Sequence, residues 1–323
     1  MIKLPCPGLL KGFFALSGSA LTVFMFAVCA QAEEVQETDP SCKPYGGYRE
    51  KIDDLKNTRI DSKVFDSLAG KKIRHIEYNT ISVFNKDDPD ENNSLYLFLN
   101  KLHVNTRPGT IEAQLLFSEN DLLDIQKVQE SERILRKRPY LTNAYILPVT
   151  VCDDQVDLMV VTQDSWALEP QFSVSKESEG TNSGFAISDG NVFGTGTNLT
   201  IGYEENTQRN LVSYEFSNPH IFNSQIATKL YFADTSDGRD VIVDISHPFY
   251  SLETPWSAGF YTQDVSQELP IRHMDEEINE FRHQSMSNRI FFGVATDVQE
   301  THTQRWVVGI SNEEDQFYPT DET

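Results

Sequence analysis

From about residue 165 onward, apolar and polar residues alternate along the chain, and this alternation constrains the fold more than any other feature of the sequence. In one segment, for example, Leu199, Ile201 and Tyr203 are separated by Thr200 and Gly202. A period of two is the spacing of a β-strand with one apolar face, because successive side chains point to opposite faces of a sheet. Nine segments follow this pattern and predict strands at residues 168–176, 184–189, 197–204, 212–217, 226–232, 241–246, 256–261, 290–294 and 306–310.

The alternating segments favour a membrane β-barrel over a soluble β-sandwich. The residues that alternate with the apolar ones are Ser, Asn, Gly, Thr and Glu, so each segment has only one apolar face. The strands of a soluble binding protein would need protein covering both faces, and no second apolar face is present here. Their lengths approach the ~9–11 residues of a tilted spanning strand, and the longest connection, 265–287, is expected as a loop on the outer side. Aromatic residues gather near the strand ends, as in an interfacial girdle: Tyr203, Tyr214, Phe216, Tyr231, Phe232, Phe249, Tyr250, Trp256 and Trp306.

The first 32 residues have the form of a secretory signal peptide. Lys3 and Lys11 precede an apolar run, and Ala30-Gln31-Ala32 supplies the small-x-small pattern that predicts cleavage after Ala32. The apolar run is short and interrupted, which disfavours a membrane anchor, and no later run approaches the ~20 apolar residues of a spanning helix. If the mature chain enters a membrane, it must do so as a closed barrel, because only helices and barrels satisfy the backbone in lipid.

Charge and cysteine content exclude several functions. The formal net charge of −22 argues against nucleic-acid binding, which needs a basic face. After signal removal only Cys42 and Cys152 remain; in an oxidising periplasm two cysteines can pair, and their geometry decides whether they do. Neither has a second ligand at metal-binding spacing, and Gly180 to Gly184 lacks the spacing of a lipase nucleophile turn. We expect no catalytic site, no cofactor and no metal.

Residues 33–72 are polar and predict a lead-in with a short helix near 51–68, whereas residues 73–164 predict a compact α/β module. Thr110 is the expected N-cap of one of its helices. The module should contain, in order, a strand at 73–83, helices at 95–102, 110–117 and 122–138, and strands at 143–151 and 155–162, with a mixed three-stranded sheet. Its helices should bury Leu99, Leu115, Leu116, Val128 and Leu135.

Three turns on one side of the alternating segments share an unusual composition. Glycine in a turn allows a positive φ or a close backbone approach, and proline at a strand end costs no ladder hydrogen bond. The turns read Asn-Val-Phe-Gly-Thr-Gly at 191–196, Asn-Pro-His-Ile-Phe at 218–222 and His-Pro-Phe-Tyr at 247–250. Their expected periplasmic turn residues are Asn191, Gly194, Gly196, Asn218, Pro219, Phe222, Pro248 and Phe249.

These turns, following an α/β module, resemble the BamA/TamA superfamily of outer-membrane assembly factors over about residues 73–260. Segments 102–107, 114–117, 130–133 and 140–141 look like its periplasmic POTRA module, and 162–166 looks like the junction into its barrel. The resemblance implies a POTRA-like module in the periplasm followed by an antiparallel transmembrane β-barrel in the outer membrane, of which 165–323 is the N-terminal portion. It also implies a function, the insertion or translocation of unfolded client polypeptides by β-augmentation.

Two departures from the superfamily pattern bear on completeness. The family's Arg-Gly-Phe motif is absent, and no strand with an aromatic end precedes Thr323. Bacterial single-chain barrels have an even number of strands, so nine strands predict an incomplete barrel that a second polypeptide completes, or a truncated chain. The alternatives to an assembly factor are therefore a passive outer-membrane pore or scaffold and a non-functional fragment.

The alternation predicts which side chains face lipid. Single cysteines at positions 213 and 244 should react with a membrane-impermeant thiol reagent, while cysteines at 214 and 243 should be protected. A charged side chain facing lipid near the midplane is destabilising, by about 2–4 kcal/mol for Arg or Lys and by less for Asp or Glu, so the register is selected. The reverse labelling pattern would show that the two faces are exchanged. The expected lipid-facing set is Val212, Tyr214, Phe216, Val241, Val243 and Ile245, and the expected lumen-facing set is Ser213, Glu215, Asp244 and Ser246.

Overall fold

A computed structural model describes most of the chain after the predicted signal peptide, and the described residues all belong to one unit, Pro40–Thr323. The signal peptide, its cleavage after Ala32, much of the lead-in, Leu99 and most of the predicted helix at 95–102 lie outside the described residues. The described residues are 41–48, 62–81, 83–84, 93–94, 98, 101, 103–177, 180–206, 209–273, 276–297 and 302–320.

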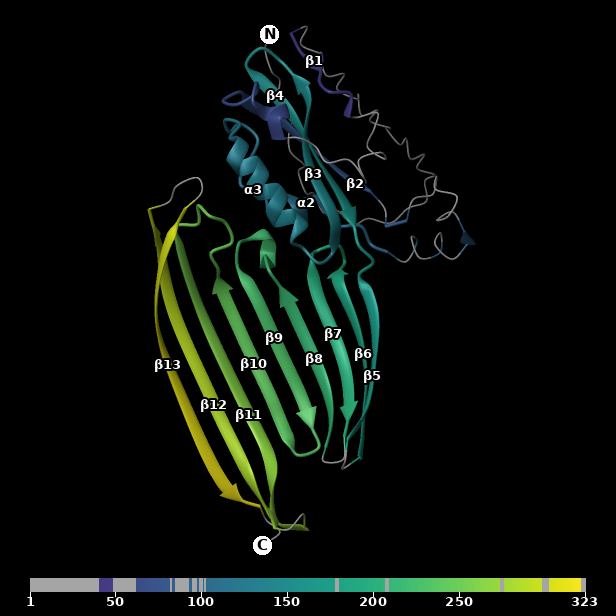
Figure 1. Cartoon of the computed structure of the whole chain (residues 1–323), viewed down its shortest axis with the longest axis vertical. Coiled ribbons are helices and arrows are strands. Elements are labelled where there is room, and N and C mark those ends of the chain that lie inside the picture. Colours follow the sequence, from purple (N-terminus) through teal and green to yellow (C-terminus); the bar gives the residue numbers. More distant parts are fainter. Residues whose placement is uncertain are drawn as a thin grey trace, which may run out of the picture. The chain divides into compact units, whose positions relative to one another are not determined.

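The N-terminal part of this unit is an α/β module with a mixed sheet (Figure 1). Its strand order is β1-β3-β4-β2; β2 and β4 are parallel, while β4 and β3 are antiparallel. The three main strands therefore form a mixed sheet, as predicted, whereas the sequence did not predict the pairing. The short strand β1 was not predicted. The elements are β1 (Lys43–Pro44), η3 (Ser62–Phe65), β2 (Lys72–Ile81), α2 (Pro108–Glu112), α3 (Ile125–Arg136), β3 (Leu141–Val151) and β4 (Gln155–Asp164).

Helix α3 covers the sheet with an apolar face. It begins at Asp124, whose carboxylate accepts the backbone N–H of Gln126 at 2.9 Å. Val128 and Leu135 are buried on its inner face as predicted, and Leu115 is buried nearby, whereas Leu116 is only half-buried. None of the described helices is long and apolar enough to span a membrane.

The prediction for Thr110 was wrong. Helix α2 begins at Pro108, with Arg107 at the N-cap position, because proline at the first helical position has the required φ and lacks an N–H that would be unpaired there. Thr110 therefore lies inside the helix, where it is buried and bonds outside the module.

The described parts of the lead-in, residues 41–48 and 62–72, contribute to the module's sheet and core, although the composition of the lead-in is polar. Phe65 and Leu68 are buried among the core residues, and Lys43 pairs with Val151 of β3. Beside this pairing, Cys42 and Cys152 form a disulfide. A few apolar residues in a polar segment were enough to anchor it, so a boundary placed at residue 72 separates residues that pack together.

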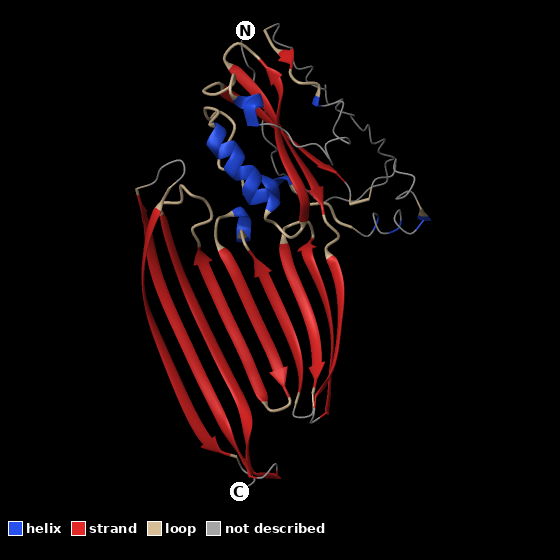
Figure 2. Cartoon of the chain, in the orientation of Figure 1, coloured by secondary structure: helices blue, strands red, loops and turns tan. Residues whose placement is uncertain are grey.

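The rest of the unit is a nine-stranded antiparallel sheet that resembles part of a barrel (Figure 2). Each strand pairs with its chain neighbours, in the order β5 to β13. Each of the nine strands overlaps one of the nine predicted segments, although β11, β12 and β13 extend well beyond them. They are β5 (Leu168–Glu177), β6 (Gly180–Val192), β7 (Thr197–Glu205), β8 (Asn210–Asn218), β9 (Ala227–Thr235), β10 (Gly238–His247), β11 (Trp256–His273), β12 (Glu276–Thr296) and β13 (Gln304–Pro319).

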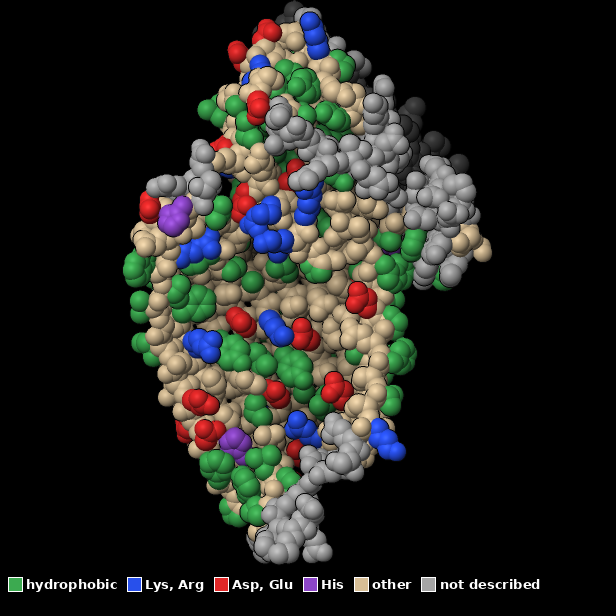
Figure 3. All heavy atoms as spheres, viewed as in Figure 1, with side chains coloured by type: hydrophobic (Ala, Val, Ile, Leu, Met, Phe, Trp, Pro, Cys, Tyr) green, Lys and Arg blue, Asp and Glu red, His purple; other side chains and the backbone are tan. Residues whose placement is uncertain are grey.

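The register gives this sheet one apolar and one polar face. Ile201 lies opposite Tyr214, which lies opposite Phe232, so apolar residues continue across the strands. On the other face Glu215 and Lys229 form an ion pair of 3.1 Å. The two sets predicted for lipid and lumen accordingly occupy opposite faces of the sheet. Figure 3 shows charged side chains distributed over the visible face of the sheet, with hydrophobic side chains protruding along both margins and in smaller groups on that face.

Two predictions for the sheet were wrong. Tyr231 lies on the polar face, opposite Glu215, rather than in the aromatic girdle. The described residues of the segment predicted as a loop, 265–273 and 276–287, are paired strand, because β11 and β12 continue past the apolar band, with Val265 opposite Ser285. The alternation of apolar and polar residues is weaker there, but the extensions of β11 and β12 pair with each other, so backbone pairing continues where the sequence pattern does not predict it.

The disulfide should stabilise the module. Replacing Cys152 with serine is expected to lower the module's free energy of unfolding by about 2–4 kcal/mol, because the bond joins residues 110 positions apart and restricts the unfolded chain. Urea titration of the full chain in detergent, followed by the fluorescence of Trp166, measures the loss. Cys42→Ser should give the same loss and the double variant no more; additive losses would contradict a shared bond.

Candidate functional site: the turns that meet the module

The turn between β6 and β7 is hydrogen-bonded to the module. The Asn191 side-chain amide donates to Thr106 Oγ1 at 2.8 Å, and its carbonyl oxygen accepts the backbone N–H of Gly196 at 2.8 Å. The Gly194 carbonyl accepts both the backbone N–H of Arg107 and the Thr110 hydroxyl, each at 2.9 Å. One buried asparagine thus closes the turn on itself and ties it to the segment that leads into α2.

The two glycines of this turn are required by geometry. Gly194 has a φ of +71°, and a Cβ there would lie 2.3 Å from the Asn105 carbonyl oxygen. Gly196 has a φ of +63°, and its Cβ would lie 2.7 Å from the ring of Tyr140. Both need the left-handed conformation that glycine adopts without a penalty, and both lie where the module approaches too closely for a side chain.

The turn between β8 and β9 joins the same assembly. The Asn218 carbonyl oxygen accepts the backbone N–H of His220 at 2.8 Å, and its amide donates to Thr197 Oγ1 at 2.7 Å, which links the two turns. The Gln225 amide donates to the carbonyl of Ala113, at the C-terminal end of α2, at 2.6 Å. Phe222, by contrast, is 93% exposed and takes no part in these bonds.

His220 ends a buried hydrogen-bond chain that begins in the module. The Arg138 guanidinium can only donate, so the Gln114 atom that it contacts must be the side-chain oxygen. The side-chain nitrogen of Gln114 then donates to the Tyr140 hydroxyl at 2.7 Å. The Tyr140 proton is therefore directed to His220 Nε2, 3.0 Å away, which requires an unprotonated nitrogen. Burial lowers the pKa of His220 to about 4, and the charge of Arg138 acts in the same direction. Burial also raises the pKa of Tyr140 to about 12, so the tyrosine remains a donor.

Asp164 fastens the end of β4 at the junction. Its carboxylate is fully buried, and Oδ2 accepts the backbone N–H of Thr106 at 2.7 Å and bonds His103 Nε2 at 2.9 Å. The other oxygen, Oδ1, is buried without a hydrogen-bond partner among the described residues. The same carboxylate thus positions the segment 103–107, which the β6–β7 turn contacts.

The turn between β10 and β11 lies against β13 and α3. The Arg305 guanidinium stacks over the ring of Phe249 at 4.7 Å and donates to the Ser251 carbonyl at 2.8 Å. Pro219, Pro248 and Phe249 line a cleft beside the C-terminal end of α3.

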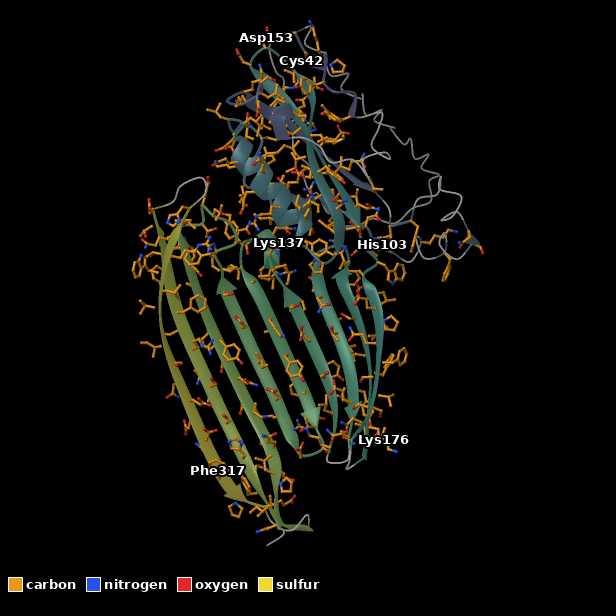
Figure 4. All side chains as sticks on the ribbon, viewed as in Figure 1. Cys42, His103, Lys137, Asp153, Lys176 and Phe317 are labelled. Carbon is orange, nitrogen blue, oxygen red and sulfur yellow. A yellow bond between two sulfur atoms is a disulfide. The ribbon has the colours of Figure 1, made fainter. Side chains whose placement is uncertain are left out.

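Figure 4 shows Lys137 and His103 beside the strand ends nearest the module, whereas Lys176 and Phe317 lie towards the other ends of the strands.

The structure brings together most of the turn residues that the sequence predicted, in two groups. Asn191, Gly194, Gly196 and Asn218 form the hydrogen-bonded junction; Pro219, Pro248 and Phe249 line the cleft; Phe222 belongs to neither. The sequence reading missed the module's contribution, which comes from Thr106, Thr110, Gln114, Tyr140 and Asp164. Within the described part of the chain, no group of His, Cys, Asp and Glu is arranged to hold a metal ion.

Comparison with protein-family models and with curated protein sequences finds no match. Among solved structures, the chain is similar to BamA from Haemophilus ducreyi lacking POTRA domains 1–3, with 11% identity and a TM-score of 0.41 over 75% of this chain and 56% of that chain. It is also similar to CdiB from Acinetobacter baumannii, with 11% identity and a TM-score of 0.36 over 77% and 49% of the two chains. The chain thus spans about half the length of these structures.

The buried histidine makes the junction sensitive to acid. In the folded chain the pKa of His220 is about 4, and in the unfolded chain it is near 6.5, so the unfolded state binds the proton first as the pH falls. Stability should therefore decrease between pH 6.5 and about 4, by at most about 1.4 kcal/mol per pH unit from this group. Unfolding of the wild type and of His220→Gln, measured across this range, tests the prediction. The variant should lose less stability than the wild type as the pH falls; parallel curves would contradict it.

Proposed function

We propose that this chain is an outer-membrane β-barrel protein that assists the insertion or translocation of polypeptides by β-augmentation, with its α/β module in the periplasm. The observation that carries the proposal is a sheet with one exposed apolar face and one polar face, whose strand ends are hydrogen-bonded to a module in which the far part of the β2 edge is covered by no described strand. The resemblance of the turn motifs to the BamA/TamA superfamily supports it.

The apolar face of the sheet has a boundary of the kind that a membrane imposes. Val241 lies opposite Phe232 and belongs to the apolar face. Two residues before it, on the same face, Arg239 forms an ion pair of 2.8 Å with Asp264 of β11. Along these strands, the apolar residues are thus followed by charged residues on the same face. This arrangement is typical of a lipid-facing belt with a polar margin at the membrane surface. At the opposite end the strands finish in the turns bound to the module.

Strand β2 offers the better edge for a client strand. Near its start the outer side is occupied, because Ile73 N–H bonds the Asp121 carbonyl and Ile76 N–H bonds the Glu119 carboxylate. Further along, no described residue bonds the outer backbone of Thr80. The opposite edge, β3, is less suitable, because Pro148 has no N–H and β1 covers its end. A client strand added to β2 would gain main-chain hydrogen bonds without displacing any described element.

Reconstitution tests the function and the edge together. In lipid vesicles, the full chain should accelerate the folding of a urea-unfolded outer-membrane barrel, followed by heat-modifiable gel migration. Thr80→Pro removes one outward N–H and should slow that folding about fivefold, the effect of one hydrogen bond of about 1 kcal/mol. Thr80→Val, which keeps the N–H, should retain the wild-type rate.

The outcomes separate the alternatives. A wild-type chain that conducts ions but folds the client no faster than empty vesicles would be a passive pore. If the wild type and Thr80→Pro accelerate client folding equally, the assembly function is supported, but β2 is not the edge to which the client strand adds.

A further inference from the structure

A cleft of about 520 Å³ at the end of the sheet gathers positive charge in an acidic protein. The whole chain has 27 Lys and Arg against 49 Asp and Glu, yet the cleft is lined by four cations and one acid. The cations are Arg133, Lys137, Arg138 and Arg305, and the acid is Glu130. Its volume lies in the range of ligand-binding pockets. A concentration of positive charge that runs against the composition of the chain points to an anionic ligand.

Internal bonds account for only part of this charge. Arg133 is neutralised by Glu130, whose carboxylate it contacts at 2.6 Å. Arg305 is held in place by a backbone carbonyl and an aromatic ring, neither of which carries a charge. Arg138 bonds the neutral Gln114. Lys137 is exposed and makes no ion pair with any described residue. The four cations and the one acid therefore leave the cleft with a net positive charge.

The register shows which side of the sheet the cleft serves. Ala227, which lines the cleft, lies opposite Ser246 and shares a face with Lys229, so it belongs to the polar face. Arg305 lies opposite Ala295 and alternates with the apolar Trp306, which places it on the polar face as well. The face proposed to contact lipid is the other one. A lipid whose acyl chains lie against the apolar face could not place its headgroup in a cleft on the polar face. A polypeptide entering along the polar face would pass the cleft.

We propose that this cleft binds the carboxylate side chains of an extended client segment where that segment meets the polar face of the sheet. The proposal rests on the proposed function and names a chemical class of substrate for it. The Arg138, Lys137 and Arg305 side chains supply the charge, and Phe249 with Pro219 and Pro248 supplies an apolar floor for the intervening side chains. Arginine is suited to such a site because its planar donors match a carboxylate.

Binding of a defined peptide tests the cleft directly. The probe is a short fluorescein-labelled peptide of alternating Glu and Val, with a Gln-Val peptide of the same length as control, and the full chain in uncharged detergent is titrated by anisotropy. The Glu peptide should bind more tightly than the Gln peptide, and its affinity should fall as salt is raised. Lys137→Glu should weaken it at least about fivefold. Lys137→Arg should retain binding.

Lys127→Glu is the matched control, because it makes the same change in net charge in the first turn of α3, outside the cleft, whereas Lys137 is the C-cap of that helix. Equal binding of the Gln peptide, or equal losses in both glutamate variants, would overturn the proposal. Inorganic phosphate and short-chain phosphatidylglycerol are added as competitors. If phosphatidylglycerol displaces the labelled peptide at a lower concentration than the unlabelled Glu peptide does, the cleft is a lipid site and the proposal is overturned.

Client folding measured in parallel separates this proposal from the proposed function. If the wild type accelerates folding but Lys137→Glu leaves peptide binding unchanged, the cleft proposal fails and the assembly function stands. If Lys137-dependent peptide binding is found without accelerated folding, the cleft stands and the assembly function fails.

Discussion

The pairing of backbone hydrogen bonds between adjacent strands is the constraint on which the rest of this structure depends. Once each strand of the large sheet pairs with its chain neighbours, the pleat decides the face of every side chain, and a shift of one residue would exchange the two faces. Ile201, Tyr214 and Phe232 can form a continuous apolar surface only in the observed register. The same pairing allows β11 and β12 to continue beyond the apolar band, since a paired backbone tolerates polar side chains on both faces.

Polar contacts rather than an apolar interface join the sheet to the module. Asn191, Asn218 and Asp164 are buried and use their side chains to bond backbone and hydroxyl groups from several elements. Buried polar groups are costly when unpaired, so a network of this kind tolerates few alternative arrangements. It gives the junction a defined geometry, and the neutral state of His220 is part of that geometry because the Tyr140 hydroxyl donates a hydrogen bond to the unprotonated Nε2.

The negative net charge of the chain conceals a local cluster of positive side chains at the cleft. The acidic balance of the chain disfavours general attraction to anionic surfaces, whereas a local group of cations at the end of α3 creates a specific positive site. The cations at the end of this helix also interact favourably with the helix dipole, so part of the cluster stabilises the module by itself. Arg305 is different, because it comes from β13, far along the chain, and only the assembled sheet brings it to the cleft.

The sequence alone determined the nine strands, their two faces and the order of the module's main elements, because each is encoded in a local period of apolar residues. It also identified the turn residues, since Asn191, Gly194, Gly196 and Asn218 stand out by residue type. Other features depended on contacts between residues far apart in the chain, which no local pattern records. The pairing of Cys42 with Cys152, the burial of Phe65 in a polar segment and the chain from Arg138 through Tyr140 to His220 are of this kind. Thr110 shows the difference most clearly: its type suggested a helix cap, but the neighbouring proline began the helix earlier, and tertiary structure brought Gly194 within reach of its hydroxyl.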